Sequence, residues 1–191
     1  MRIFVDMDDI LVNLLSEWTF RLNKVSKYHN EPDDIIRWDM KIAYPDLPPN
    51  TLYAPLYWDE MWEDVKPVKD AYKYMKKLIE DGHEVYVATA STPHSLSVKT
   101  EHCLFKIFDF LTYKNVISIH NKSLLDGDIL FDDYHENLRN FKGIKVLRDK
   151  PYNTNVDTPY VDFRVSTNNS WEEFYAIVEE LQKLEEMCTI V

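Results

Sequence analysis

The chain has 191 residues, of which 45% are apolar and 14% aromatic, and it carries a net charge of −11. This length suits one domain with a sizeable core and an inserted subdomain, and the apolar content excludes a disordered chain. The acidic charge argues against a nucleic-acid polymer as partner, because such a binding face needs clustered Lys and Arg, whereas a small phosphorylated substrate needs only a local positive site.

The N-terminal segment predicts a buried β-strand at residues 2–5, because Ile3-Phe4-Val5 is a short apolar run of strand-forming residues. Asp6-Met7-Asp8-Asp9 follows at once, and its charges interrupt any signal peptide. No run approaches the length of a membrane span, and Cys103 and Cys188 match no metal or redox spacing. We therefore expect a cytoplasmic protein without a membrane partner.

Residues 10–27 predict an amphipathic helix whose inward face is formed by Leu11, Leu14, Leu15, Trp18, Leu22 and Val25. The next stretch, residues 29–66, is rich in proline, which favours several short helices. We expect residues 15–66 to form a small helical cap on a core made of residues 1–14 and 67–191. Most aromatic residues of this stretch are expected to form the cap's own core, and one or two could stack on a base: Trp38, Tyr44, Tyr53, Tyr57, Trp58 and Trp62.

After this insertion, strands and helices alternate along the chain. We expect strands at residues 83–88, 116–119, 129–131 and 144–147, and helices at residues 67–82, 97–108 and 135–141. Ser170-Trp171-Glu172-Glu173 has the pattern of a capping box and predicts the start of a last helix. This alternation predicts an α/β fold with a doubly wound parallel sheet.

Polar residues follow four of the predicted strands. They would meet at one edge of the sheet, because the carboxyl ends of parallel strands lie together and ligands bind there. In chain order these residues are Asp6 with Asp8, Thr89, Lys122, and Asp132 with Asp133. Converging carboxylates repel one another unless a cation lies among them. The pattern therefore predicts a hard divalent metal ion, with Mg²⁺ as the first candidate.

These residue types suit phosphoryl transfer. Asp6 is the candidate nucleophile, which would form an aspartyl-phosphate and so divide one difficult displacement into two steps. Asp8 is the candidate acid and base, which would protonate the leaving oxygen and then deprotonate the attacking water.

The remaining strand-end residues could bind the phosphoryl group and the metal. The hydroxyl of Thr89 and the backbone N–H groups from Ala90 onward offer hydrogen bonds to phosphoryl oxygens, and Lys122 adds a positive charge. Asp132 and Asp133 could hold Mg²⁺ and so reduce the repulsion between two anions.

Together, these motifs resemble those of the haloacid dehalogenase superfamily of phosphohydrolases. The resemblance is carried by Asp6-Met7-Asp8-Asp9-Ile10-Leu11, the strand that ends at Thr89, Lys122, and Leu130-Phe131-Asp132-Asp133. More narrowly, the chain resembles the 5′(3′)-deoxyribonucleotidase family in its Val-Asp-Met-Asp opening, its size, its insertion after the first motif and the spacing from Lys122 to the last acidic pair.

The resemblance implies a Rossmann-like core with a small helical cap, Mg²⁺ dependence and dephosphorylation of deoxyribonucleoside monophosphates. It implies that the metal is held by the side chain of Asp6, the backbone carbonyl of Asp8 and, by position, Asp133, with Asp132 as support. It also places two further residues near the base, Leu14 and Trp38.

Three positions depart from the family pattern. Asp9 stands where other members often carry Gly, and we expect it to cap the first helix. Ala90 stands where some members carry a Ser that binds phosphate, and His120-Asn121 stands where some carry an Arg before the lysine. These differences bear on which nucleotide is preferred.

Other functions remain open from the sequence. A phosphatase for another small ester, such as a sugar phosphate, would share the same catalytic residues. A signalling receiver domain also groups Asp, Thr and Lys at strand ends, but it carries its phosphoacceptor in mid-chain before the Thr and has no cap. A catalytically silent nucleotide-binding protein would not need the full catalytic set. The sequence also leaves a homodimer open.

Overall fold

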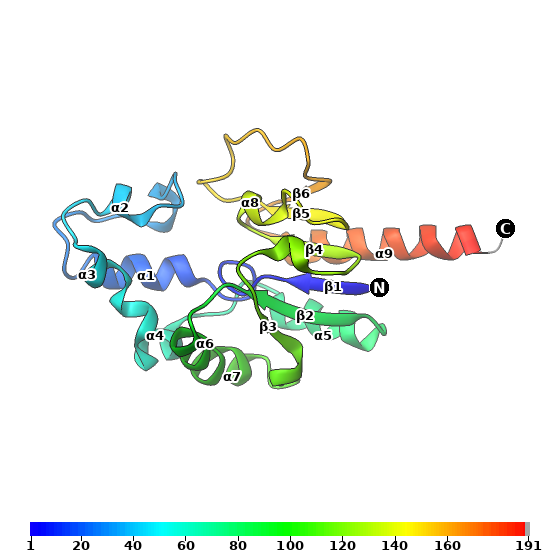
Figure 1. Cartoon of the computed structure of the whole chain (residues 1–191), viewed down its shortest axis with the longest axis horizontal. Coiled ribbons are helices and arrows are strands. Elements are labelled where there is room, and N and C mark those ends of the chain that lie inside the picture. Colours follow the sequence, from blue (N-terminus) through cyan, green and yellow to red (C-terminus); the bar gives the residue numbers. More distant parts are fainter. Residues whose placement is uncertain (190–191) are drawn as a thin grey trace.

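The computed structural model describes residues 1–189 and contains a six-stranded parallel sheet in the order β3-β2-β1-β4-β5-β6 (Figure 1). The strands are β1 (Arg2–Val5), β2 (Glu84–Thr89), β3 (Val116–Ser118), β4 (Ile129–Asp132), β5 (Ile144–Arg148) and β6 (Phe163–Val165). The first strand, β1, lies in the middle of the sheet. The next two strands, β2 and β3, lie on one side of it, and β4, β5 and β6 lie on the other. The order therefore reverses between β1 and β4, which creates a crevice at their carboxyl ends. The predicted Rossmann-like α/β fold is confirmed.

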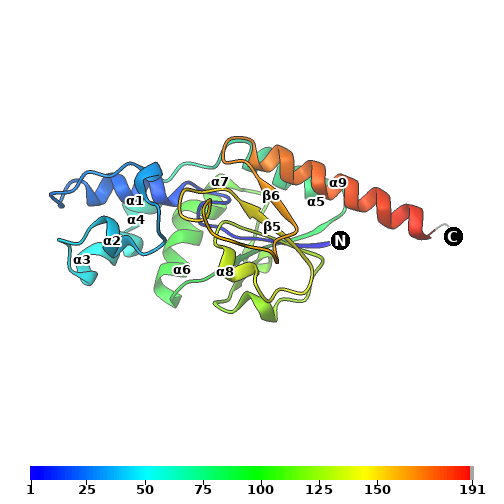
Figure 2. The same cartoon turned by 90° about the horizontal axis from the view of Figure 1, so that it is seen from above.

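Helices cover both faces of the sheet (Figure 2). On one face, α5 (Ala71–Glu80) packs against α9 (Ser170–Thr189), and on the other α8 (His135–Leu138) packs against β4 and β5. Alternate strand residues serve the two faces: Ile3 and Val5 join the large apolar cluster with Phe174, whereas Phe4 joins a smaller cluster with Leu138. Within residues 1–189, no helix combines the length and apolar character that a membrane span requires.

Residues 15–66 lie beyond the carboxyl ends of the strands (Figure 1). They are built from α1 (Leu14–Leu22), η1 (Pro32–Asp34), α2 (Met40–Ala43), α3 (Pro49–Tyr53), η2 (Ala54–Tyr57) and α4 (Asp59–Asp64). Of the six aromatic residues expected to fill this segment, only Tyr44 and Trp62 are buried, and the other four are 36–46% exposed. The expectation that most of them form a core is therefore wrong.

The two connections to this segment are joined to each other. Val12 forms a β-bridge with Pro67, and the backbone and side chain of Asn13 donate to the carbonyl oxygens of Lys66, at 2.8 Å, and Pro67, at 2.9 Å. This pairing explains why α1 begins at Leu14 rather than Ile10, and why α5 begins only after Pro67, past the left-handed residue Asp70.

Other element bounds also differ from the prediction; for example, the helix expected at residues 135–141 ends at Leu138. The helix expected at residues 97–108 begins earlier, as α6 (Pro93–Lys99), and continues through a π-helical turn (Thr100–Leu104) into α7 (Phe105–Ile107). Val25 lies beyond the end of α1 and is exposed. The short edge strand β6 was not predicted, because two of its three residues are exposed and give no apolar run.

The predicted capping box does not form, because the Glu173 side chain binds a different residue. The carboxylate of Glu173 accepts hydrogen bonds from the backbone and hydroxyl of Ser166, at 2.6 and 2.5 Å, rather than from Ser170. The helix nevertheless begins at Ser170, as expected.

Phe174 joins α9 to the sheet, because its ring stacks on Phe131 with the centroids 4.3 Å apart. We expect Phe174→Ala to lower the free energy of unfolding by about 3–5 kcal/mol, since it leaves a cavity in a fully buried site. Urea denaturation measures this change. Phe20→Ala, at an exposed position of α1, is the matched control and should change stability by less than about 1 kcal/mol. Equal losses in the two variants would contradict this view of the core.

Candidate active site

Three carboxylates meet at the carboxyl ends of β1 and β4. Asp6 follows β1 directly, Asp132 ends β4, and Asp133 comes next in the chain. All three are buried, and one oxygen from each lies within 4.8 Å of the others. The strands hold them together, because the backbone N–H of Asp6 donates to the carbonyl of Phe131 at 2.9 Å. A buried set of carboxylate oxygens at this spacing fits a hard divalent cation such as Mg²⁺.

Lys122 lies between two of these carboxylates. Its Nζ contacts Oδ1 of Asp6 and donates to Oδ2 of Asp132 at 2.5 Å, and its side chain is fully buried. Burial lowers the pKa of Lys122, but the charges of Asp132 and Asp6 outweigh burial and raise the pKa overall. The lysine therefore remains protonated and reduces the repulsion between two of the acids.

Asp132 already has partners on both oxygens. Oδ1 accepts from the backbone of Tyr134 at 2.9 Å, Oδ2 accepts from Lys122, and the Asn137 amide contacts both oxygens at 3.1 Å. A carboxylate bonded in this way has little capacity left for a metal ion.

Asp133 is bonded differently. Its Oδ2 accepts from the hydroxyl of Tyr152, and no lysine or arginine described in the structure contacts its carboxylate. Burial, followed by the nearby charges of Asp132 and Asp6, raises the pKa of Asp133 well above its usual range. A cation beside Asp133 would remove this repulsion, so the residues present fit a metal at this position.

A second lysine, which sequence reasoning missed, joins Asp8 to Thr89. The Nζ of Lys99, on α6, donates to Oδ2 of Asp8 at 2.8 Å and to Oγ1 of Thr89 at 2.6 Å. The lysine is almost fully buried, whereas Oδ1 of Asp8 has no hydrogen-bond partner among the described residues. Burial raises the pKa of Asp8, and the charge of Lys99 opposes this shift. The sequence signal was a lysine among inward-facing helix residues, next to Val98.

Asp9 forms a third pair, with Lys150 at 2.8 Å, and both of these side chains are buried. Its other oxygen accepts from the backbone N–H of Leu15 at 3.1 Å, in the first turn of α1, so it does cap this helix as expected. Arg148 donates to the carbonyl oxygen of Asp9 and to that of Thr167. Neither Arg148 nor Lys150 was predicted, although both follow the strand expected at residues 144–147.

A cavity of about 470 Å³ opens between the strand ends and residues 15–66. Its lining includes four residues that the sequence singled out: Asp8, Ala90, Leu14 and Trp38. The aromatic residues Trp18 and Tyr53 also line it. The buried residues Asp6, Thr89, Lys122, Asp132 and Asp133 lie at the strand ends and are not among its lining. The structure therefore brings all the predicted residues to one end of the sheet, in two adjoining groups.

Residues 1–184 match the model of a family described as 5′ nucleotidase, deoxy (Pyrimidine), cytosolic type C protein.

Curated relatives agree with this match. The chain is 34% identical over 172 residues to a 5′(3′)-deoxyribonucleotidase of Bacillus subtilis (strain 168), covering 90% of this chain and 94% of that protein. It is 29% identical over 178 residues to a 5′(3′)-deoxyribonucleotidase of Clostridium acetobutylicum, with 93% and 94% covered.

Solved structures share the fold. A haloacid dehalogenase family hydrolase from Deinococcus radiodurans R1, with bound phosphate and sodium, superposes with a TM-score of 0.62 at 11% identity and covers 94% of this chain and 95% of its own. A haloacid dehalogenase-like protein of unknown function from Agrobacterium tumefaciens gives a TM-score of 0.58 at 10% identity, with 94% and 98% covered.

The pair formed by the buried Lys99 and the partly exposed Asp8 generates a stability prediction. Lys99→Met leaves the Asp8 carboxylate without its cation, so we expect the free energy of unfolding to fall by about 1.5–3 kcal/mol. Adding Asp8→Asn should recover part of this loss, which a double-mutant cycle in urea measures. Lys106→Met, at an exposed lysine paired with Glu63, is the control and should cost less than about 1 kcal/mol. Strict additivity of Lys99→Met and Asp8→Asn would contradict the pairing.

Proposed function

Because the chain belongs to the 5′ nucleotidase, deoxy (pyrimidine), cytosolic type C family, a family of phosphoric monoester hydrolases in the haloacid dehalogenase superfamily, we propose that it removes phosphate from deoxyribonucleoside monophosphates with Mg²⁺ as cofactor. The observation that carries this proposal is the buried set of Asp6, Asp132 and Asp133 beside a cavity walled by aromatic residues. The acidic set suits a metal and a phosphoryl group, and aromatic walls suit a base.

Asp6 is the proposed nucleophile. Its carboxylate oxygen attacks phosphorus, and the bond to the ester oxygen breaks, which gives an aspartyl-phosphate and the nucleoside. Lys122, bonded to Oδ1, fixes the orientation of this carboxylate and offsets its repulsion from the incoming phosphate.

Asp8 is the proposed acid and base. In its protonated form it gives its proton to the leaving ester oxygen, and it then accepts a proton from the water that attacks the aspartyl-phosphate. Its unpartnered oxygen, Oδ1, is free for this exchange. Asp8 also lines the cavity, so it lies where a leaving group would sit.

Thr89 and Ala90 are proposed to bind the phosphoryl oxygens. Since Lys99 donates to Oγ1 of Thr89, the hydrogen of that hydroxyl is directed to another acceptor, which we assign to a phosphoryl oxygen. Ala90 would contribute its backbone N–H. Lys99 is thus a positioning residue in this scheme.

Asp6, Asp8 and Asp133 are proposed to hold Mg²⁺, Asp8 through its backbone carbonyl, with Asp132 as support. The support role follows from the bonds that already occupy both oxygens of Asp132. The metal would supply positive charge that aligns the nucleophile with the phosphate and stabilises the transition state.

Residues 15–66 are proposed to act as the cap that selects the substrate, above a core made of residues 1–14 and 67–191. Leu14 and Trp38, on the cavity wall, are the proposed contacts of the base. We further propose that the protein acts in the cytoplasm, and its two free cysteines fit a reducing compartment.

A phosphate-release screen tests the proposed activity. With Mg²⁺, deoxyribonucleoside monophosphates should be hydrolysed faster than ribonucleotides or sugar phosphates, and EDTA should stop the reaction. Asp6→Asn should lower the rate at least about 10⁴-fold, because it removes the nucleophile, while Mg²⁺ binding weakens only in part. Asp126→Asn, exposed before the amino end of β4, is the matched control and should remain active. An active Asp6→Asn enzyme would exclude this mechanism, and a preference for sugar phosphates would exclude the substrate.

The two neighbouring acids can be separated by calorimetry. We expect Asp133→Asn to weaken Mg²⁺ binding by more than about 100-fold, and Asp132→Asn to weaken it by roughly 10-fold, because only the former removes a direct ligand. The two variants are matched controls for each other, since each replaces a buried carboxylate by an amide of the same shape. The reverse order would mean that Asp132 is the direct ligand.

A further inference from the structure

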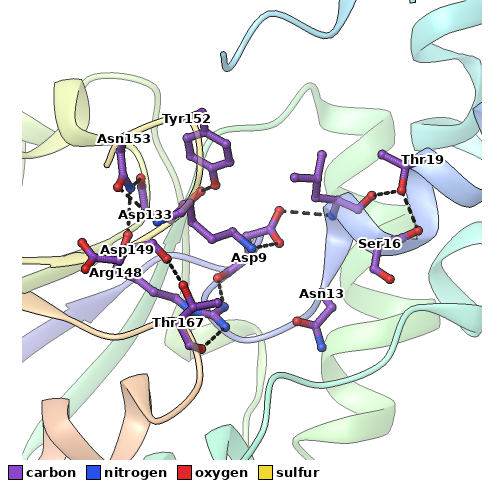
Figure 3. Close-up of polar contacts among 12 residues, drawn as sticks. Asp9, Asn13, Ser16, Thr19, Asp133, Arg148, Asp149, Tyr152, Asn153 and Thr167 are labelled. Carbon is purple, nitrogen blue, oxygen red and sulfur yellow. Dashed lines mark hydrogen bonds and ion pairs between the residues drawn. The ribbon is translucent and has the colours of Figure 1, made fainter. Parts of the chain in front are cut away.

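Tyr152, in the loop that follows β5, lies against the candidate metal ligand Asp133. The side chain is buried, and its hydroxyl donates to Oδ2 of Asp133 (Figure 3). We propose that Tyr152, with its neighbour Asn153, is a positioning residue that orients Asp133 for Mg²⁺. This inference rests on the proposed function, in which Asp133 binds the metal directly.

The same loop holds Asp133 by its main chain. The side-chain amide of Asn153 donates to the carbonyl oxygen of Asp133 at 2.7 Å and to that of Arg148 at 2.8 Å. The loop is closed on itself, because the backbone N–H of Asn153 donates to the Lys150 carbonyl at 3.0 Å and the backbone N–H of Lys150 donates to Oδ1 of Asn153 at 3.1 Å. Asp133 is therefore fixed at two points by one rigid turn.

The partner of Asp133 differs in charge from those of the neighbouring acids. Lys122 contacts both Asp6 and Asp132, whereas Lys99 contacts Asp8 and Lys150 contacts Asp9: each of these four carboxylates has a cation. A lysine on Asp133 would compete with a metal ion for the same negative charge. A neutral hydroxyl instead fixes one oxygen and leaves the charge and the second oxygen to the metal.

The ring of Tyr152 is itself held in place. Trp38 meets it edge to face, with ring centroids 5.1 Å apart, and stacks on Tyr134 with centroids 5.0 Å apart. Among the described residues, the hydroxyl of Tyr134 makes no hydrogen bond, although its ring belongs to the same aromatic group. Tyr134 therefore offers a matched control for the loss of a tyrosine hydroxyl at this site.

The test compares Tyr152→Phe with Tyr134→Phe in the full chain. We expect Tyr152→Phe to weaken Mg²⁺ binding by about 10–100-fold in calorimetry, the range found when a residue that supports a metal ligand is removed. The Mg²⁺ concentration for half-maximal activity should rise equally, while kcat at saturating Mg²⁺ is largely retained. Tyr134→Phe should match the wild type in both measurements. Urea unfolding confirms that each variant is folded.

Asn153→Ala is the second variant, because it releases the main chain of Asp133 without changing the tyrosine, and it should weaken Mg²⁺ binding as well. Wild-type affinity in Tyr152→Phe, or an equal loss in Tyr134→Phe, would overturn the inference and leave the proposed function intact. A fall in kcat without a change in Mg²⁺ affinity would also overturn it. A wild-type protein that binds no Mg²⁺ would overturn the proposed function and this inference together.

Discussion

The repulsion among five carboxylates at the carboxyl edge of the sheet is the constraint on which the rest of the site depends. Asp6, Asp8, Asp9, Asp132 and Asp133 all lie within a few residues of the ends of β1 and β4. Buried charges of one sign are costly unless each is paired or hydrogen-bonded. Three lysines contact four of these acids, and the fifth is bonded by a hydroxyl. The acid that no described lysine or arginine contacts, Asp133, is therefore the position proposed for the metal ion.

The same pairs also tie distant parts of the chain together. The Lys99–Asp8, Lys122–Asp6 and Lys150–Asp9 contacts join residues that are 91, 116 and 141 positions apart. The lysines come from α6, from the turn after β3 and from the loop after β5. The site is complete only when all of these elements have docked on the sheet, so its polar network depends on the entire core. The positions of these residues along the sequence give little indication of this dependence.

The separation of these partners along the sequence explains which features could be predicted. Asp6, Thr89 and the pair Asp132-Asp133 stand at strand ends, and Lys122 lies in the turn that follows β3, so the short apolar runs were enough to place them. Lys99 and Tyr152 act through partners that only tertiary packing provides, and the position of Lys99 beside the inward-facing Val98 does not identify those partners. Element bounds failed for a similar reason. Pro67 is held by a bridge to Val12 and cannot begin a helix, and Glu173 binds Ser166 because β6, an edge strand without an apolar run, brings it near.

The paired connections at Val12, Asn13, Lys66 and Pro67 have a mechanical consequence. The outgoing and returning segments are fastened to each other where they leave the core, and Asp9 anchors the first turn of α1 from the core side. Because the two connections are joined to each other, residues 15–66 have a single double-stranded attachment to the core. Trp38 adds a separate contact with the loop after β5, since its ring meets Tyr152 with the centroids 5.1 Å apart.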